Sequence, residues 1–194
     1  MKEMAVKLLV PAAVAGLLFG AAAGAKPAAA QQPASLAADS VFIQTAGSVG
    51  LLQVKLGKLA EKKGSSPAVV EFGKRMASDY SKTNQDLATA AKQAAFPAPV
   101  LLRQDQQAFD RFSRMGRSSF DKAYMTEMVT QHADEVRLFQ RESESGKVHL
   151  LKQVASTMLP DLQERLSLAT QTAGSIGVNV TASAAAAGQG STGK

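Results

Sequence analysis

Apolar side chains recur every three or four residues between about residues 39 and 172, and no stretch shows the strict alternation of a β-strand. This periodicity predicts helices over about residues 39–63, 67–95, 101–115, 119–145 and 148–172. The breaks between them coincide with residues that end helices, namely Gly64, the segment Phe96-Pro97-Ala98-Pro99, Gly116 and Gly146. Pro160 lies inside the last predicted helix and should bend it, because proline removes one backbone hydrogen bond.

Four of these helices are long, and each carries one apolar stripe that must be buried against the others. The short turns at 64–66 and 146–147 predict two antiparallel helix pairs, and the longer connection at 96–118 joins the pairs. The sequence therefore predicts an all-α domain over residues 39–173. Its expected form is a four-helix bundle with an extra short helix in the crossover between long helices 2 and 3.

The first 30 residues have the features of a secretory signal peptide. Lys2 and Lys7 form a basic start, an uncharged run rich in Ala, Leu and Val covers residues 8–25, and small residues follow. Cleavage is expected after Ala25 or after Ala30, which would place the protein in the periplasm or outside the cell. An uncleaved membrane anchor is the alternative, since 18 apolar residues approach the length of a span.

Two further segments fall outside the predicted bundle. Residues 31–38 are a linker of Gln, Pro, Ala and Ser, and residues 174–194 form a low-complexity tail that we expect to be disordered. The chain contains no Cys. This excludes a lipid anchor on cysteine, disulfide bonds and thiol catalysis.

The formal net charge of +6 falls to +4 when residues 1–30 are removed, so the remaining chain is mildly basic. Its clearest cationic run consists of Arg103, Arg111, Arg114 and Arg117. The run lacks the aromatic pattern that stacks on bases, so nucleic acid is not an expected partner. We interpret it as a solvated face, with contact to an anionic membrane surface as the alternative.

Each long helix carries one conspicuous polar residue on its buried stripe, and these four are Gln53, Tyr80, His132 and Arg165. Measured from the turns at 1.5 Å per residue, they fall within one or two helical turns of a common level. Burying them is unfavourable unless they meet hydrogen-bond partners. We therefore expect a mid-bundle polar layer in which His132 bonds to the Tyr80 hydroxyl and the Gln53 amide.

Other residues near this level extend the hypothesis. Arg165 needs a counter-charge, and the carboxylates within reach by sequence are Glu135, Glu164 and Asp161. His149 is expected at the exposed start of the last helix, where we assign it no role.

Several segments together resemble a known family. They are Gly57-Lys-Leu-Ala60, the run from Phe72 to Lys82 that includes Asp79-Tyr80, the run Phe120-Asp-Lys-Ala-Tyr-Met-x-x-Met-Val-x-x-His132, and Leu159-Pro160-x-Leu162. Over about residues 39–172 the chain is similar to the DUF4142 family. The resemblance implies an exported bacterial protein with a ferritin-like helical bundle and no settled function.

The resemblance also implies a mid-bundle site with Glu on the first helix and His on the other three. Here Gln53 stands in place of Glu, Tyr80 in place of the Asp-His pair, and Arg165 in place of His, so only His132 matches. Gln is a weak neutral ligand, Tyr binds metals mainly as phenolate, and Arg has no lone pair to donate. We therefore interpret the layer as a degenerate site with a structural role.

A metal site is the alternative interpretation. His132 shares a stripe with Met125 and Met128, Met76 and Met158 lie on facing stripes, and Glu135 and Asp79 are nearby carboxylates. Thioethers suit Cu(I), and the His and carboxylate groups would suit Fe or Mn.

Nucleophilic catalysis has no support, because the chain has no Gly-rich phosphate loop and no Ser on a strand-to-helix elbow. The sequence thus predicts a non-enzymatic exported bundle without a cofactor that either binds a protein or a small ligand or has a role in envelope stress. Transition-metal binding is its alternative function.

Overall fold

The computed structural model describes residues 36–179 and contains five α-helices and no strand within that range, which confirms the all-α prediction. The helices are α1 (Ala37–Lys63), α2 (Pro67–Gln93), α3 (Arg103–Arg114), α4 (Arg117–Ser145) and α5 (His149–Ser175). None of the described helices is both long enough and apolar enough to cross a membrane. The predicted signal peptide, most of the predicted linker and residues 180–194 lie outside the described range.

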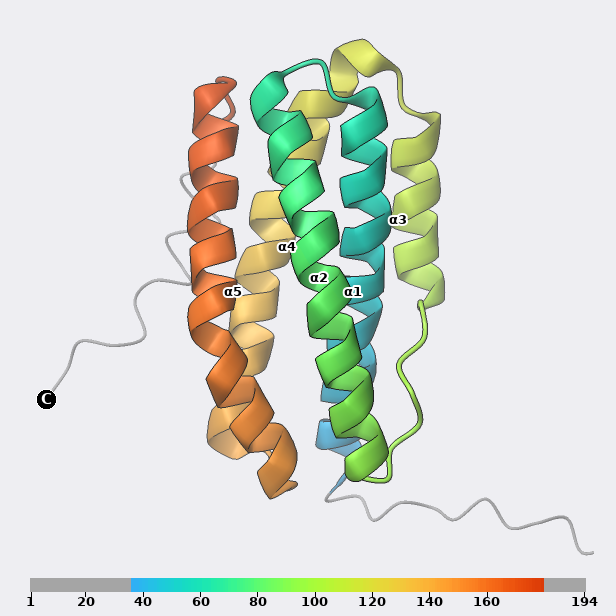
Figure 1. Ribbon diagram of the computed structural model, residues 1–194, viewed down its shortest axis with the longest axis vertical. Helices are drawn as coiled ribbons and strands as arrows, with labels where there is room; N and C mark the ends of the chain where they lie inside the picture. Colours follow the sequence, from blue (N-terminus) through green and yellow to red (C-terminus); the bar gives the residue numbers. More distant parts are fainter. Residues whose placement is uncertain (1–35, 180–194) are drawn as a thin grey trace, which may run out of the picture. The chain divides into compact units, whose positions relative to one another are not determined.

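The helices pack as two hairpins. α1 packs mainly on α2 and α4 mainly on α5, while smaller α1–α4 and α2–α5 interfaces join the hairpins and α3 packs on α1. In Figure 1, α1 and α5 run in one direction and α2 and α4 in the other. The connection between the hairpins therefore returns along the molecule beside α1, and α3 forms part of it.

The helix ends lie close to their expected positions. α1 and α4 each begin two residues earlier than expected, and α5 continues to Ser175, which includes two residues of the predicted tail. Pro160 lies inside α5 without ending it. Figure 1 shows α5 changing direction in its N-terminal part, as a proline at this position predicts.

A carboxylate from each hairpin binds the turn of the other hairpin. Asp39, near the start of α1, is fully buried and accepts hydrogen bonds from the backbone N–H groups of Lys147 (3.0 Å) and Val148 (2.7 Å). Asp121, near the start of α4, accepts bonds in the same way from the N–H groups of Ser65 (3.1 Å) and Ser66 (2.7 Å).

These pairs reveal an internal repeat. Asp39 and Asp121 are 82 residues apart, as are the turn glycines Gly64 and Gly146. Both glycines end their helices with nearly the same backbone angles, φ −55° and ψ 137° for Gly64 and φ −54° and ψ 150° for Gly146. The two hairpins are thus structural copies related by an approximate two-fold axis, and each contributes the carboxylate that completes the other.

The buried interior consists of two apolar clusters. One gathers residues toward the α1–α2 turn, including Leu56, Phe72 and Tyr124, and the other gathers residues toward the α4–α5 turn, including Phe42 and Phe139. On α2, α4 and α5 the polar side chains lie between the two clusters in sequence. The polar layer therefore divides the apolar core near the middle of the long helices.

α1 and α2 approach each other closely at a pair of glycines. A Cβ atom built on Gly57 would lie 2.5 Å from the carbonyl oxygen of Gly73, and one built on Gly73 would lie 2.7 Å from the Cβ of Ala60. Only residues without a side chain fit at both positions. This explains the glycine in the Gly57-Lys-Leu-Ala60 segment by the packing of two backbones.

We expect Gly57→Ala to destabilise the protein by about 1–3 kcal/mol, because the new methyl group meets backbone atoms of α2 that cannot rotate away. Urea unfolding followed by circular dichroism would measure the change. Gly174→Ala is the matched control, since that helical glycine has open space around its Cβ position. The control should be neutral or stabilising by up to about 1 kcal/mol, and an equal loss in both variants would contradict the close-approach argument.

α3 is held by buried polar contacts with α1 as well as by Ala108 and Phe112, which join the apolar core. The Ser48 hydroxyl donates to the Asp105 carboxylate and accepts a bond from the Leu102 N–H (2.8 Å). The preceding segment packs Pro99 over Gly47 on α1, where a Cβ would lie 2.1 Å from the proline ring. α3 is thereby fixed to the outside of α1.

Candidate functional site

The structure buries all four residues of the predicted polar layer. Gln53, Tyr80 and His132 are completely buried, and Arg165 is 8% exposed. They come from α1, α2, α4 and α5 in turn, so each long helix contributes one member. His149 is exposed at the first residue of α5, as expected.

Tyr80 is the residue that joins three of the helices in this layer. Its hydroxyl donates a hydrogen bond to the buried Glu135 carboxylate on α4. The guanidinium carbon of Arg165 lies 4.6 Å from the centre of the Tyr80 ring, in a cation–π arrangement. Tyr80 therefore contacts an anionic group through its hydroxyl and a cationic group through its ring.

Arg165 has few partners for a buried cation. Its Nη2 donates to the Thr83 hydroxyl at 3.1 Å, and this hydroxyl in turn donates to the Asp79 carbonyl at 3.1 Å. Arg165 forms no salt bridge with any described residue. Its guanidinium thus keeps N–H donors that no described carboxylate accepts.

His132 does not bond to the partners that we predicted. Its Nδ1 lies 2.7 Å from the Met128 carbonyl oxygen, which can only accept, so Nδ1 carries the proton and Nε2 has the lone pair. Nε2 is buried and has no hydrogen-bond partner among the described residues. The ring packs edge-on against Phe72 and Tyr80, with centroids 6.1 Å and 5.9 Å away.

The Gln53 amide also differs from the prediction. Its Nε2 donates to Gln131 Oε1 at 2.9 Å, and Gln131 donates to Glu127 at 2.8 Å. The predicted pairing failed because Gln131 and Glu135, on the α4 turns beside His132, compete for the same donors. Both residues are polar, so the sequence signalled them, but helical spacing alone does not say which rotamer meets which partner.

The pKa values of Glu135 and His132, the two titratable groups that α4 contributes to the layer, are shifted in opposite directions. Burial raises the pKa of Glu135 to about 7, although the Tyr80 hydroxyl and the Arg165 charge both act to lower it. Burial lowers the pKa of His132 to about 4, and the Arg165 charge acts in the same direction. Burial also raises the pKa of Tyr80 well above its ordinary value. At neutral pH the layer thus contains a neutral His132, a neutral Tyr80 and a Glu135 near its midpoint.

The internal repeat shows that this layer is built asymmetrically. Thr83 and Arg165 are repeat partners 82 residues apart and bond directly to each other. Gln53 corresponds to Glu135 and Tyr80 to Leu162 at the same spacing. Leu162 has no hydroxyl to offer, and Gln53 Oε1 is a buried acceptor without a partner among the described residues. One half of the layer therefore has the Tyr80–Glu135 pair, and the equivalent positions of the other half are Leu162 and Gln53, which form no such pair.

Arg165 connects the polar layer to a surface groove between α2 and α5. The groove has a volume of about 690 Å³. Its α2 wall consists of Arg75, Asp79, Lys82, Thr83 and Asp86. Its α5 wall consists of Leu150, Gln153, Val154, Thr157, Met158, Asp161, Glu164 and Arg165.

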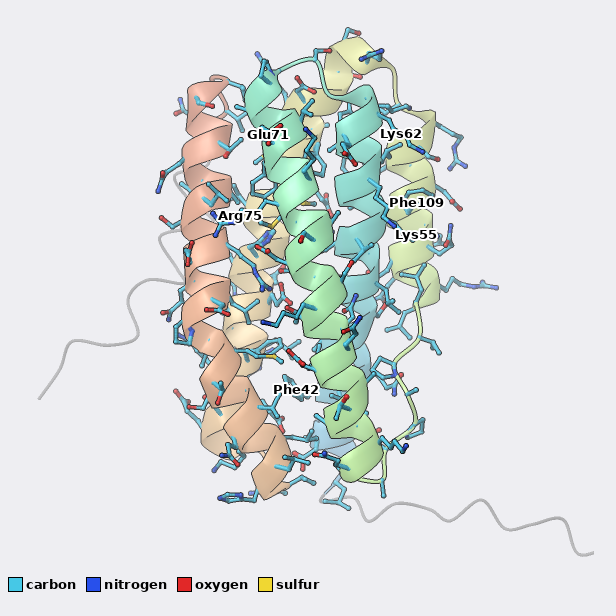
Figure 2. All side chains as sticks on the ribbon, in the orientation of Figure 1. Phe42, Lys55, Lys62, Glu71, Arg75 and Phe109 are labelled. Carbon is cyan, nitrogen blue, oxygen red and sulfur yellow. The ribbon has the colours of Figure 1, made fainter. Side chains whose placement is uncertain are left out.

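The charges of the groove are only partly paired. Arg75 on α2 forms ion pairs with Glu164 on α5 (2.6 Å) and with Asp79 on α2 (3.4 Å). Figure 2 labels Arg75 on the side of α2 that faces α5. Asp86 and Asp161 form no salt bridge with another described residue. The groove thus combines the buried Arg165 cation, the exposed Lys82 ammonium, two carboxylates without a salt bridge and an apolar row on α5.

The residues of the metal hypothesis do not all meet. Met125, Met128, His132 and Glu135 are buried on α4, whereas Asp79 is half-buried on the α2 wall of the groove and bonded to Arg75. Among the described residues, no group of three or more His, Asp or Glu side chains is placed to hold a metal ion. The thioethers of Met125 and Met128 remain next to His132 along one helix face.

Sequence analysis missed Thr83 as a member of the site. A threonine on an apolar stripe carries no distinctive signal, and only its contact with Arg165 reveals its role. The repeat spacing is the signal that would have found it, because Thr83 occupies the position equivalent to Arg165.

The comparison with protein families agrees with the motifs. The sequence profile described as a domain of unknown function, DUF4142, matches residues 24–172. The chain belongs to the DUF4142 family. The match covers all four long helices of the structure up to Thr172 in α5, and it confirms the resemblance to this family. No curated protein and no solved structure matched the chain.

Membership of DUF4142 assigns no activity, so the function has to be inferred from the geometry of the site. The polar layer has no exposed nucleophile, and its acid and base groups are buried beneath Arg165 and Thr83. What it offers to the surface is a single guanidinium at the floor of a groove.

Proposed function

We propose that this DUF4142 protein is an exported, non-enzymatic binding protein built as a ferritin-like four-helix bundle. In this proposal the α2–α5 groove receives a small zwitterionic ligand. The observation that carries it is the Arg165 guanidinium, which is 92% buried at the floor of the groove and has no carboxylate partner among the described residues. The order of the helices supports the bundle type, since two hairpins joined by one long crossover are the ferritin-like arrangement.

A buried cation without a counter-charge lowers the stability of the fold by several kcal/mol, and an anion bound beside it would offset this loss. Glu135 relieves this only in part, because the Tyr80 hydroxyl occupies its Oε2 and its pKa of about 7 leaves it partly neutral at pH 7. A carboxylate of a ligand would accept hydrogen bonds from the remaining N–H donors of Arg165. The planar guanidinium is well suited to this, because it can donate two parallel hydrogen bonds to one carboxylate.

The rest of the groove indicates what else the ligand carries. Asp86 and Asp161 would attract an ammonium group, and they would disfavour an anion without one. Leu150, Val154 and Met158 lie one turn apart on α5 and offer an apolar surface. A free amino acid or short peptide with an apolar side chain has all three features.

Three related compounds would test this proposal by calorimetric titration. Leucine has both charges, N-acetyl-leucine has only the carboxylate, and leucinamide has only the ammonium group. We expect leucine to bind at least tenfold more tightly than either analogue. Arg165→Gln should weaken leucine binding by about tenfold or more, while Arg137→Gln, at a half-buried arginine of α4 that does not line the groove, should leave leucine binding unchanged. Equal binding of all three compounds, or no binding of leucine at millimolar concentration, would contradict the proposal.

Metal binding is the second candidate, favoured by the lone pair of His132 Nε2 beside Met125 and Met128. The Nε2 atom is the group that a soft cation would bind, with the thioethers as further ligands. Metal analysis after incubation with Cu(I), Fe(II) or Mn(II) would test it. Stoichiometric metal that is lost in His132→Phe would favour this function, and a melting temperature insensitive to every ion would exclude it.

Export rests on the signal-peptide pattern of residues 1–30. Cell fractionation and N-terminal sequencing would test it, since a mature chain should begin at Lys26 or Gln31. A cytoplasmic chain that retains Met1 would contradict export without affecting the ligand proposal.

A further inference from the structure

α3 presents a row of arginines on the side opposite to its packing face. Arg103, Arg111 and Arg114 follow one another at steps of eight and three residues, which places them on one stripe together with Gln107. All four side chains are exposed. The buried residues Asp105, Ala108 and Phe112 occupy the opposite stripe, so the arginine row points away from α1.

Neighbouring helices extend this charge. Arg117, at the start of α4, is exposed just beyond α3, and Lys58 and Lys62 are exposed on α1. Lys55 of the same α1 stripe contacts α3, with its ammonium 4.5 Å from the centre of the Phe109 ring. Figure 2 shows Lys55 and Lys62 on the side of α1 next to α3. We call Lys58, Lys62, Arg103, Arg111, Arg114 and Arg117 the basic face.

The acidic residues near the basic face do little to neutralise it. Asp121 is bound to the α1–α2 turn, and Asp110 accepts a hydrogen bond from Gln106. Glu127 contacts Arg111 at 3.4 Å, and Glu61 is exposed between the two lysines of α1. The six cations of the basic face therefore outnumber these four carboxylates, of which Asp121 is occupied by the α1–α2 turn.

We propose that the basic face binds the anionic headgroups of a phospholipid membrane. Its charges are spread over three helices, and over about 17 Å of α3 alone, and none of them lines the α2–α5 groove. This matches a surface of many separate phosphates better than one enclosed ligand. Guanidinium groups suit phosphate because they donate two parallel hydrogen bonds.

Two observations favour lipid over nucleic acid as the partner. The aromatic rings of α3 are unavailable for stacking, since Phe112 is 2% exposed and Phe109 is half-buried under Lys55. Val100, a strongly exposed apolar side chain (59%), precedes the arginine row by three residues. An apolar contact beside basic residues is typical of a peripheral membrane surface.

Co-sedimentation of the full chain with vesicles tests this proposal. We expect binding to vesicles of phosphatidylcholine and phosphatidylglycerol in equal parts at 50 mM NaCl, and at least tenfold weaker binding at 300 mM. Vesicles of phosphatidylcholine alone should not sediment the protein. Equal binding to both vesicle types would overturn the proposal, because it would indicate insertion of an apolar segment instead.

Charge variants separate the basic face from net charge. Arg103→Gln, Arg111→Gln, Arg114→Gln and Arg117→Gln combined should weaken vesicle binding by roughly 100-fold. The matched control replaces four exposed cations elsewhere by Gln, namely Lys74, Lys92, Arg141 and Lys147, and should bind nearly as well as the unmodified chain. Circular dichroism verifies that both variants fold. An equal loss in both, or tighter binding to a 20-base-pair DNA duplex than to the anionic vesicles, would overturn the proposal.

Discussion

Replacing Glu135 by Gln should stabilise the protein relative to the unmodified chain by an amount that grows with pH, from almost nothing near pH 4.5 to about 3 kcal/mol at pH 7. The pKa of Glu135 is raised to about 7 in the fold. As pH rises from 4.5 toward 7, the unfolded chain loses this proton first, so the folded state binds more protons and loses stability. The size of this loss is about 3 kcal/mol.

His132 has the opposite effect in almost the same window. Its pKa is lowered to about 4 in the fold, so between pH 6.5 and 4 the unfolded chain takes up a proton that the folded protein does not. The folded state therefore gains about 3 kcal/mol as pH rises from 4 to 6.5. In the unmodified protein the two contributions nearly cancel, and removing either side chain should reveal the other.

Urea unfolding at half-unit steps from pH 4 to 7.5 would measure both effects. Relative to the unmodified protein, Glu135→Gln should gain stability as pH rises from 4.5 to 7, and His132→Phe should lose stability as pH rises from 4 to 6.5. Glu142, whose pKa is also raised to about 7, is present in all three proteins and cancels from the differences. Glu144→Gln, an exposed carboxylate on α4, is the matched control. Parallel curves for Glu135→Gln and the unmodified chain would contradict the assignment.

The second large effect is expected from the carboxylates that bind the turns. Asp39→Ala removes the acceptor of two backbone N–H groups at the α4–α5 turn, and Asp39 is completely buried. An unsatisfied buried donor is unfavourable by about 1–3 kcal/mol. We therefore expect Asp39→Ala to lower the free energy of unfolding by about 2–4 kcal/mol, and Asp121→Ala to have an effect of the same kind at the opposite end.

Denaturant unfolding of both single variants and of the double variant would measure these effects. The carboxylates share no partner, so their losses should add to within about 0.5 kcal/mol. Asp134→Ala is the control, since its ion pair with Arg137 is on the surface and should contribute less than about 1 kcal/mol. If Asp39→Ala costs no more than Asp134→Ala, the turn contacts contribute little to stability.

The helices could be predicted because their signals are local. Apolar periodicity, glycine and proline located all five, and the turn lengths placed the four polar residues near one level. Burial of Gln53, Tyr80, His132 and Arg165 followed from the same periodicity. Counting residues along a helix is enough to say which side chains point inward and how far along they lie.

The partners within the layer could not be predicted in this way. His132 and Glu135 are three residues apart on α4, which is less than one helical turn. Whether Tyr80 donates to one or to the other therefore depends on side-chain rotamers and on the offset between α2 and α4 along the bundle. Asp39 and Asp121 resemble ordinary acidic residues at helix starts, and only the antiparallel packing of α1 on α4 brings each to the opposite turn. The groove likewise depends on the separation of α2 and α5, which no local pattern specifies.

The exchange of carboxylates between the hairpins has a consequence for how the chain folds. Neither hairpin can provide the hydrogen-bond acceptor for the backbone N–H groups of its own turn. The carboxylate that accepts these bonds lies near the start of a helix in the other hairpin, about 55 residues or more away in the sequence. A nascent chain ending before Asp121 would therefore have an open α1–α2 turn, and docking of the second hairpin would close both ends together. The two copies should consequently unfold in a single cooperative transition, even though each is a self-contained helical pair in sequence.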